Sequence, residues 1–90
     1  MYTLLEHKDV IKILKKLPKE ILKNYVAWKR IVELEGPHGL RFVTGFYDEA
    51  LKGEWKGFRS SRLNRQWRVI YKADHEALEV YIIEINPHTY

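Results

Sequence analysis

The chain has 90 residues and no cysteine, so its length suits one domain and neither a disulfide framework nor a cysteine-based metal site is available. Apolar residues make up 46% of the chain and aromatic residues 13%, which excludes a disordered protein. The 16 basic and 12 acidic residues give a net charge of +4, which favours a polyanionic partner such as nucleic acid, an acidic protein or an anionic membrane surface.

The N-terminal half predicts a strand followed by two helices. Residues 2–6 suit a short strand, and from His7 to Leu17 apolar residues recur at helical spacing with lysines between them. Pro18 interrupts this pattern but is well suited to the first turn of a new helix. The second predicted helix, residues 18–35, carries one apolar stripe: Ile21, Leu22, Tyr25, Trp28 and Val32.

The C-terminal half predicts three strands. Residues 36–39, Gly-Pro-His-Gly, end the helical region, and residues 40–57 are the least regular part of the chain. The strand candidates are Phe58–Leu63, Trp67–Ala73 and Leu78–Ile85. The order β-α-α-β-β-β predicts a single α+β domain over residues 1–90, with the two helices packed on one face of a small, mainly antiparallel sheet.

Nothing in the sequence suggests a membrane location. No apolar run is long enough to span a bilayer, and the first residues lack a signal-peptide pattern. We therefore expect a cytoplasmic protein with no membrane partner.

The segment RSSRLNRQWRVIYK, residues 59–72, concentrates positive charge in a predicted hairpin. A three-residue turn, Asn64 to Gln66, gives a register with Leu63 opposite Trp67. The same register sets Arg62 opposite Arg68 on the face away from the helices, whereas a two-residue turn would give a poorer apolar match. The core-facing side of this hairpin is then formed by Leu63, Trp67, Val69 and Tyr71.

The facing arginines have two interpretations. They can form a solvated basic face with both side chains in water, or they can form an anion site. Guanidinium groups hold phosphate through paired hydrogen bonds and keep their charge near neutral pH.

Residues 51–71, LKGEWKGFRSSRLNRQWRVIY, resemble the signature segment of the RelE/ParE superfamily, the toxins of bacterial type II toxin–antitoxin modules. The shared pattern is Leu-Lys-Gly, a short gap, Gly, a strand with Arg, a turn, and Arg-hydrophobic-hydrophobic-Tyr. The segment is similar to the YoeB-like and HigB-like branches in particular. The resemblance implies a RelE-like microbial RNase fold and an endoribonuclease that cuts mRNA in the ribosomal A site without a metal or cofactor.

The resemblance also implies roles for individual residues. The ribose 2′-OH attacks the adjacent phosphate, so a base, a cation and an acid are needed. Glu49 stands where these toxins have the general base, although a glutamate in the first turn of a short helix is the alternative. Arg68 matches the phosphate-binding arginine and Arg62 a second family arginine. Further candidates for binding RNA phosphates are Arg59, Lys52 and Lys72.

The C-terminal residues, INPHTY, differ from the family pattern. YoeB-like toxins end in an adjacent His-Tyr pair with the histidine as general acid, whereas Thr89 separates His88 from Tyr90 here. The alternative is a frayed chain end. His88 is therefore the expected acid, with Tyr90 as the second candidate. No two histidines have helical ligand spacing, so no metal site is expected.

The implied partners are a cognate antitoxin protein, the ribosome and mRNA, with promoter DNA bound only through the antitoxin. Two alternatives keep the same fold. One is a ParE-like gyrase poison, which lacks the nuclease residues, and the other is a non-catalytic RNA- or protein-binding module. Trp55 has two possible roles, which are stacking on a nucleotide and packing on the rim of the core.

Overall fold

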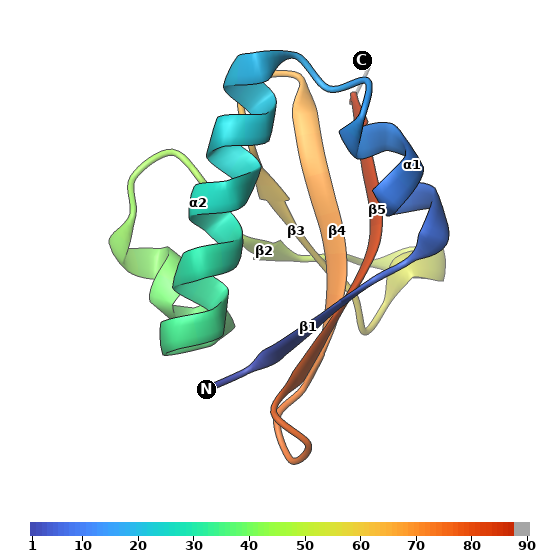
Figure 1. Cartoon of the computed structure of the whole chain (residues 1–90). Coiled ribbons are helices and arrows are strands. Elements are labelled where there is room, and N and C mark those ends of the chain that lie inside the picture. The colour runs from blue at the N-terminus through green and yellow to red at the C-terminus, as the bar shows by residue number, and fades with distance from the viewer. Residues whose placement is uncertain (88–90) are drawn as a thin grey trace.

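The order of elements agrees with the prediction, with one additional short strand and two 3₁₀ helices (Figure 1). The computed structural model describes residues 1–87. The elements are β1 (Thr3–Glu6), α1 (Lys8–Leu14), α2 (Lys19–Glu35), η1 (Pro37–Phe42), β2 (Glu49–Ala50), η2 (Gly53–Trp55), β3 (Arg59–Arg62), β4 (Trp67–Asp74) and β5 (Glu79–Pro87).

Helix α1 begins where the sequence indicates but ends earlier than predicted. The imidazole Nδ1 of His7 accepts a hydrogen bond from the backbone N–H of Asp9 at 3.1 Å and caps the first turn. The helix ends at Leu14 rather than Leu17. The residue before a proline is disfavoured in helical conformation, so Pro18 limits how far the helix can continue.

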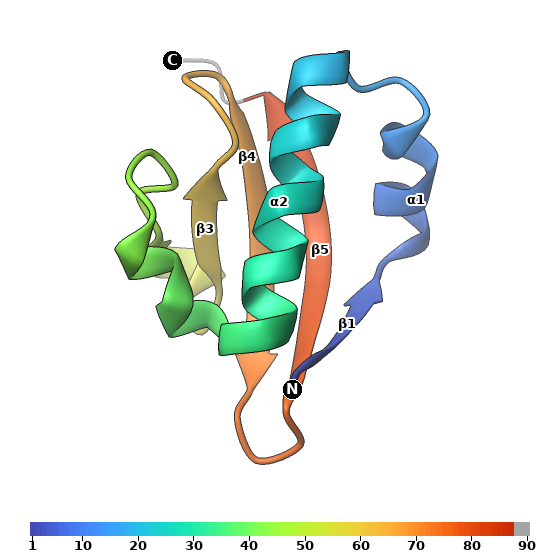
Figure 2. The ribbon, with the colours of Figure 1, turned by 60° about the vertical axis from the view of Figure 1, so that its left-hand side comes forward.

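Helix α2 presents the predicted apolar stripe to the sheet. It lies across β4 and β5 in Figure 2, and Ile21, Tyr25, Trp28 and Val32 are all buried. Leu22, also expected on this stripe, is 36% exposed and lies at its margin. Neither α-helix is long and apolar enough to cross a membrane, as judged over the described residues.

The five strands form one mixed sheet in the order β1-β5-β4-β3-β2. β1 pairs with β5 in parallel, and the other three pairs are antiparallel. This confirms the predicted α+β class with a mainly antiparallel sheet. Buried side chains from α1, α2 and the strands meet in one core cluster, in which Val10, Trp28 and Tyr71 are almost inaccessible to solvent.

The predicted register of the β3–β4 hairpin is confirmed. Arg62 lies opposite Arg68, and the backbone N–H of Leu63 donates to the carbonyl of Trp67 at 2.8 Å. The side-chain oxygen of Asn64 accepts hydrogen bonds from the backbone of Gln66 at 2.8 Å and of Trp67 at 2.7 Å. Asparagine commonly closes turns in this way, so the turn length follows from local chemistry.

Strand β2 was not predicted. It has two residues and pairs with β3, Glu49 opposite Ser60 and Ala50 opposite Arg59. Two residues are too few to produce a recognisable alternation of apolar and polar side chains. They also lie within residues 40–57, where the sequence shows no regular pattern.

Candidate functional site

The side of the sheet that faces away from α2 carries four of the predicted site residues: Glu49, Arg62, Arg68 and Lys72. Directly opposed strand residues project to the same face, as do alternate residues along one strand. Two adjacent rows follow from the register: Glu49, Ser60, Ile70 and Glu84, and next to them Arg62, Arg68 and Asn86. We call this side the arginine face. It consists of these residues together with Lys72.

The arginine face is only partly exposed. Ser60 and Ile70 are 3% and 9% exposed, so the first row is covered along its middle. Arg62 and Glu49 are exposed, and Arg68 is half-buried. A ligand can therefore reach Glu49, Arg62 and the exposed part of Arg68.

The arginine pair is accommodated by an aromatic neighbour. Like charges directly opposite each other destabilise a sheet. The guanidinium carbon of Arg62 lies 5.1 Å from the ring centroid of Tyr47, a cation–π arrangement. Arg68, on the other side of the pair, lies opposite Asn86 on β5. The two cations are thus held on one surface, where an anion could bind both.

Glu49 belongs to the same surface. It is exposed and lies opposite Ser60, and Arg62 is the next residue along that face of β3. The alternative in which Glu49 occupies the first turn of a helix is not observed, because the residue lies in β2. A carboxylate and two guanidinium groups therefore share one face of the sheet.

Asp48 anchors the strand that carries Glu49. Its carboxylate is only 6% exposed and accepts hydrogen bonds from the Arg59 guanidinium at 2.8 Å, the Ser61 hydroxyl at 2.7 Å and the Tyr71 hydroxyl at 2.5 Å. Burial, and then the bond to Asp48, raise the pKa of the Tyr71 phenol above its ordinary range. These bonds tie β2 to β3 and β4 immediately beside Glu49.

Sequence reasoning missed both Asp48 and its neighbour Tyr47. Tyr47 has a φ of 43°, a conformation uncommon for a residue with a side chain, and is 63% exposed. The bonds of Asp48 come from β3 and β4, which lie far from it along the chain, so no spacing in the sequence signals them. The only local signal was the charged pair Asp48-Glu49 before the Leu-Lys-Gly motif.

Not all predicted site residues lie together. Arg59, which was predicted to bind RNA phosphates, projects to the face that packs against the helices and forms an ion pair with Asp48 there. It therefore lies on the opposite face of the sheet from Arg62 and Arg68. Lys52 is exposed just before η2. Lys72 lies on the arginine face, with its ammonium 5.7 Å from the centroid of the Phe58 ring. His88 and Tyr90 lie outside the described residues, and their roles remain predictions.

Several solved structures have the same fold as this chain, whereas no family model and no curated protein matches it. The chain is 28% identical to a protein in the archaeal RelE–RelB complex from Pyrococcus horikoshii, with a TM-score of 0.75 over 96% of this chain and 93% of that one. It is 26% identical to a chain of a RelBE toxin–antitoxin complex from Mycobacterium tuberculosis, with a TM-score of 0.73 over 97% and 98% of the two chains. A chain of the YoeB–YefM complex from Staphylococcus aureus has the same fold at 17% identity, with a TM-score of 0.75 over 99% of both chains.

Proposed function

We propose that this chain, which has the fold of RelE/ParE-superfamily toxins, is a ribosome-dependent endoribonuclease that cleaves mRNA. Its solved neighbours are toxins of type II toxin–antitoxin modules, and this supports a toxin role. The observation that carries the nuclease proposal is the shared face of Glu49, Arg62 and Arg68. Those three side chains supply a base and two cations for one phosphodiester.

The proposed reaction is internal transesterification of RNA. Glu49 removes the proton from the ribose 2′-OH, and the resulting oxygen attacks the adjacent phosphorus. Arg68, assisted by Arg62, stabilises the negative charge that develops on the phosphorane. The bond to the 5′-oxygen then breaks, and His88 or Tyr90 donates the proton that this oxygen needs. The products are a 2′,3′-cyclic phosphate and a 5′-hydroxyl.

The proposed protein partner is a cognate antitoxin. Two of the solved relatives were captured in complexes with RelB and YefM. An acidic segment of such a partner would be attracted to the arginine face and would exclude RNA from it. Promoter DNA would then be bound through the antitoxin. Saturating cognate antitoxin should stop cleavage, and an unchanged rate would refute this inhibitory contact.

Analysis of the cleavage products tests the reaction class. Purified chain is mixed with ribosomes carrying a defined mRNA, and the fragment ends are identified by mass spectrometry. Fragments with 2′,3′-cyclic phosphate and 5′-hydroxyl ends are expected. If the mRNA stays intact and a separate assay shows that the chain inhibits DNA gyrase, the ParE-like alternative is favoured. If the mRNA is bound but uncut, a non-catalytic module is favoured.

The same assay includes a variant that separates cleavage from binding. Glu49→Gln keeps the size and polarity of the side chain but removes the proton acceptor. We expect ribosome binding close to that of the wild type and little formation of the cyclic phosphate end. Equal yields of this end from both proteins would exclude Glu49 as the base.

A further inference from the structure

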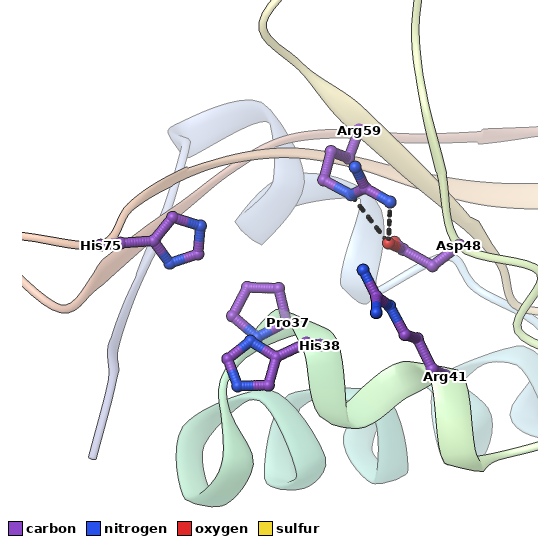
Figure 3. A pocket seen from close by; sticks show the side chains of 6 residues that line it. All are labelled: Pro37, His38, Arg41, Asp48, Arg59 and His75. Carbon is purple, nitrogen blue, oxygen red and sulfur yellow. Dashed lines mark hydrogen bonds and ion pairs between the residues drawn. The ribbon is translucent and has the colours of Figure 1, made fainter.

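A polar cavity lies on the other side of the sheet, away from the arginine face. It has a volume of about 140 Å³ and opens between η1, β3 and the turn that joins β4 to β5 (Figure 3). This is smaller than the roughly 300–1,000 Å³ of pockets that enclose whole small-molecule ligands, so it suits one small group. Its lining residues are Pro37, His38, Arg41, Asp48, Arg59 and His75.

The charge of this cavity is positive. Of the residues that the structure describes, Asp48 contributes the only carboxylate to the lining, and its side chain is 6% exposed and already accepts hydrogen bonds from Arg59, Ser61 and Tyr71. Its charge is therefore compensated by the Arg59 guanidinium. Arg41 adds a second guanidinium, which Figure 3 shows directed toward Asp48 and Arg59. Among residues 1–87, no hydrogen bond or ion pair engages the Arg41 side chain.

Two imidazoles add donors to the same opening. The Tyr2 hydroxyl and Nδ1 of His75 form a hydrogen bond of 2.7 Å, which leaves Nε2 of His75 for a ligand. His38 lies between His75 and Arg41 along the cavity and makes no hydrogen bond within the described part of the chain (Figure 3). The cavity thus combines one uncommitted guanidinium, the remaining N–H groups of another, and two imidazoles.

We propose that this cavity is a phosphate-binding site, for free phosphate or for a phosphate group of a nucleic acid backbone. Guanidinium groups match the geometry of phosphate oxygens, and a bound dianion would relieve the repulsion between Arg41 and Arg59. The same two cations disfavour a metal ion. Arg59 and Arg62 project to opposite faces of β3, so this site is separate from the proposed nuclease site and does not depend on it.

Titration of the ¹⁵N-labelled chain with inorganic phosphate tests the site. Amide shifts should saturate and concentrate at residues 36–41, Asp48, Arg59 and His75. Arg41→Gln should weaken the affinity roughly tenfold or more, because it removes a charge-assisted bond. Arg30→Gln, at an exposed arginine of α2, is the matched control and should leave the affinity unchanged. Spectra outside the cavity should be the same for all three proteins, which checks their folding.

A second titration identifies the source of the phosphate. A short 2′-O-methyl RNA cannot be cleaved by 2′-OH attack and serves as the nucleic acid probe. If backbone phosphates are the source, Arg41→Gln weakens binding of this RNA as well as of inorganic phosphate. If free phosphate is the source, only the inorganic titration responds.

Three results would overturn the proposal. Phosphate shifts that do not saturate, or that follow the basic surface generally, would indicate ionic screening. Equal affinity of the wild type and Arg41→Gln would remove the cavity from the interaction. Saturation of the same amides by acetate at the same concentrations as phosphate would assign the cavity to carboxylates, such as acidic side chains of a protein partner.

Discussion

Asp48 links the edge of the sheet to its centre through a single carboxylate. It compensates the charge of Arg59, accepts hydrogen bonds from the hydroxyl groups of Ser61 and Tyr71, and directly precedes the proposed base Glu49. A buried carboxylate is stable only when it is well bonded, and this one is. Removal of its partners or of Asp48 itself should therefore affect both stability and the position of Glu49.

Asp48→Ala should lower the free energy of unfolding by about 2–3 kcal/mol, the size of effect expected when bonds to a charged group are lost. Asp9→Ala is the matched control, because that carboxylate is 69% exposed, and it should cost less than about 1 kcal/mol. Urea unfolding followed by tryptophan fluorescence measures both. Similar losses for the two variants would show that Asp48 is not an anchor.

The raised pKa of Tyr71 predicts that the protein loses stability in alkali. Burial and the bond to Asp48 raise the pKa of its phenol above the usual value of about 10. The folded state thus holds this proton more tightly than the unfolded state does. The resulting stabilisation is fully present below about pH 10 and is lost as the pH rises toward the folded value.

The variant Tyr71→Phe cannot ionise at this position. It should be less stable than the wild type by about 1 kcal/mol at pH 7, because Asp48 loses a donor. Its free energy of unfolding should fall less steeply than that of the wild type between pH 9 and 11. Equal slopes over this range, measured by urea unfolding at each pH, would rule out the linkage.

At the scale of the elements, the end of α2 places η1 and its side chains beside the sheet. The helix ends at Glu35 and is capped by Gly36, which has a φ of +79°. A Cβ added to Gly36 would lie 2.7 Å from the Tyr2 ring. Gly53 has a similar φ of +69° but no atom within 4 Å of such a Cβ. Gly36 also has a ψ of 174°, a combination essentially confined to glycine, so a side chain there would meet both an unfavourable backbone and a clash.

Gly53→Ala should lower the free energy of unfolding by about 1–2 kcal/mol, the cost of a left-handed residue. Gly36→Ala should cost at least about 1 kcal/mol more, because its backbone conformation is essentially confined to glycine and the added methyl overpacks the contact with Tyr2. Thermal and urea unfolding of both variants measures the difference. If Gly36→Ala is no less stable than Gly53→Ala, close packing does not require the glycine at the end of α2.

The elements that could be predicted are those with a repeating pattern. Helix α2 has four buried residues at helical spacing, and the β3–β4 hairpin has an alternation that only one turn length satisfies. Strand β2 has two residues and no period, and the conformation of Tyr47 depends on contacts made by the folded chain. Arg59 and Arg62 were both predicted to bind RNA phosphates, although the alternation of β3 separates them onto opposite faces.

At the scale of the whole molecule, basic side chains on opposite sides of one small sheet can serve different ligands. The arginine face carries Glu49, Arg62 and Arg68 of the proposed nuclease site, and the cavity at Arg41 and Arg59 lies on the other side. The net charge of +4 favours approach to a polyanion from either side. Chemistry is expected only at Glu49, whose carboxylate is exposed beside the paired arginines, because Asp48 in the cavity is buried and already bonded to Arg59, Ser61 and Tyr71.

The proposal that the arginine face cleaves mRNA is tested by single-turnover cleavage of ribosome-bound mRNA. The wild type is compared with Arg68→Ala and with Arg30→Ala, an exposed arginine of α2, after circular dichroism has shown that all three are folded. We expect a loss of roughly 10²–10³-fold in the rate of the chemical step for Arg68→Ala, because the developing charge loses its stabilising cation, and an unchanged rate for Arg30→Ala. Cleavage by Arg68→Ala at the wild-type rate, or no cleavage by the folded wild type, would contradict it.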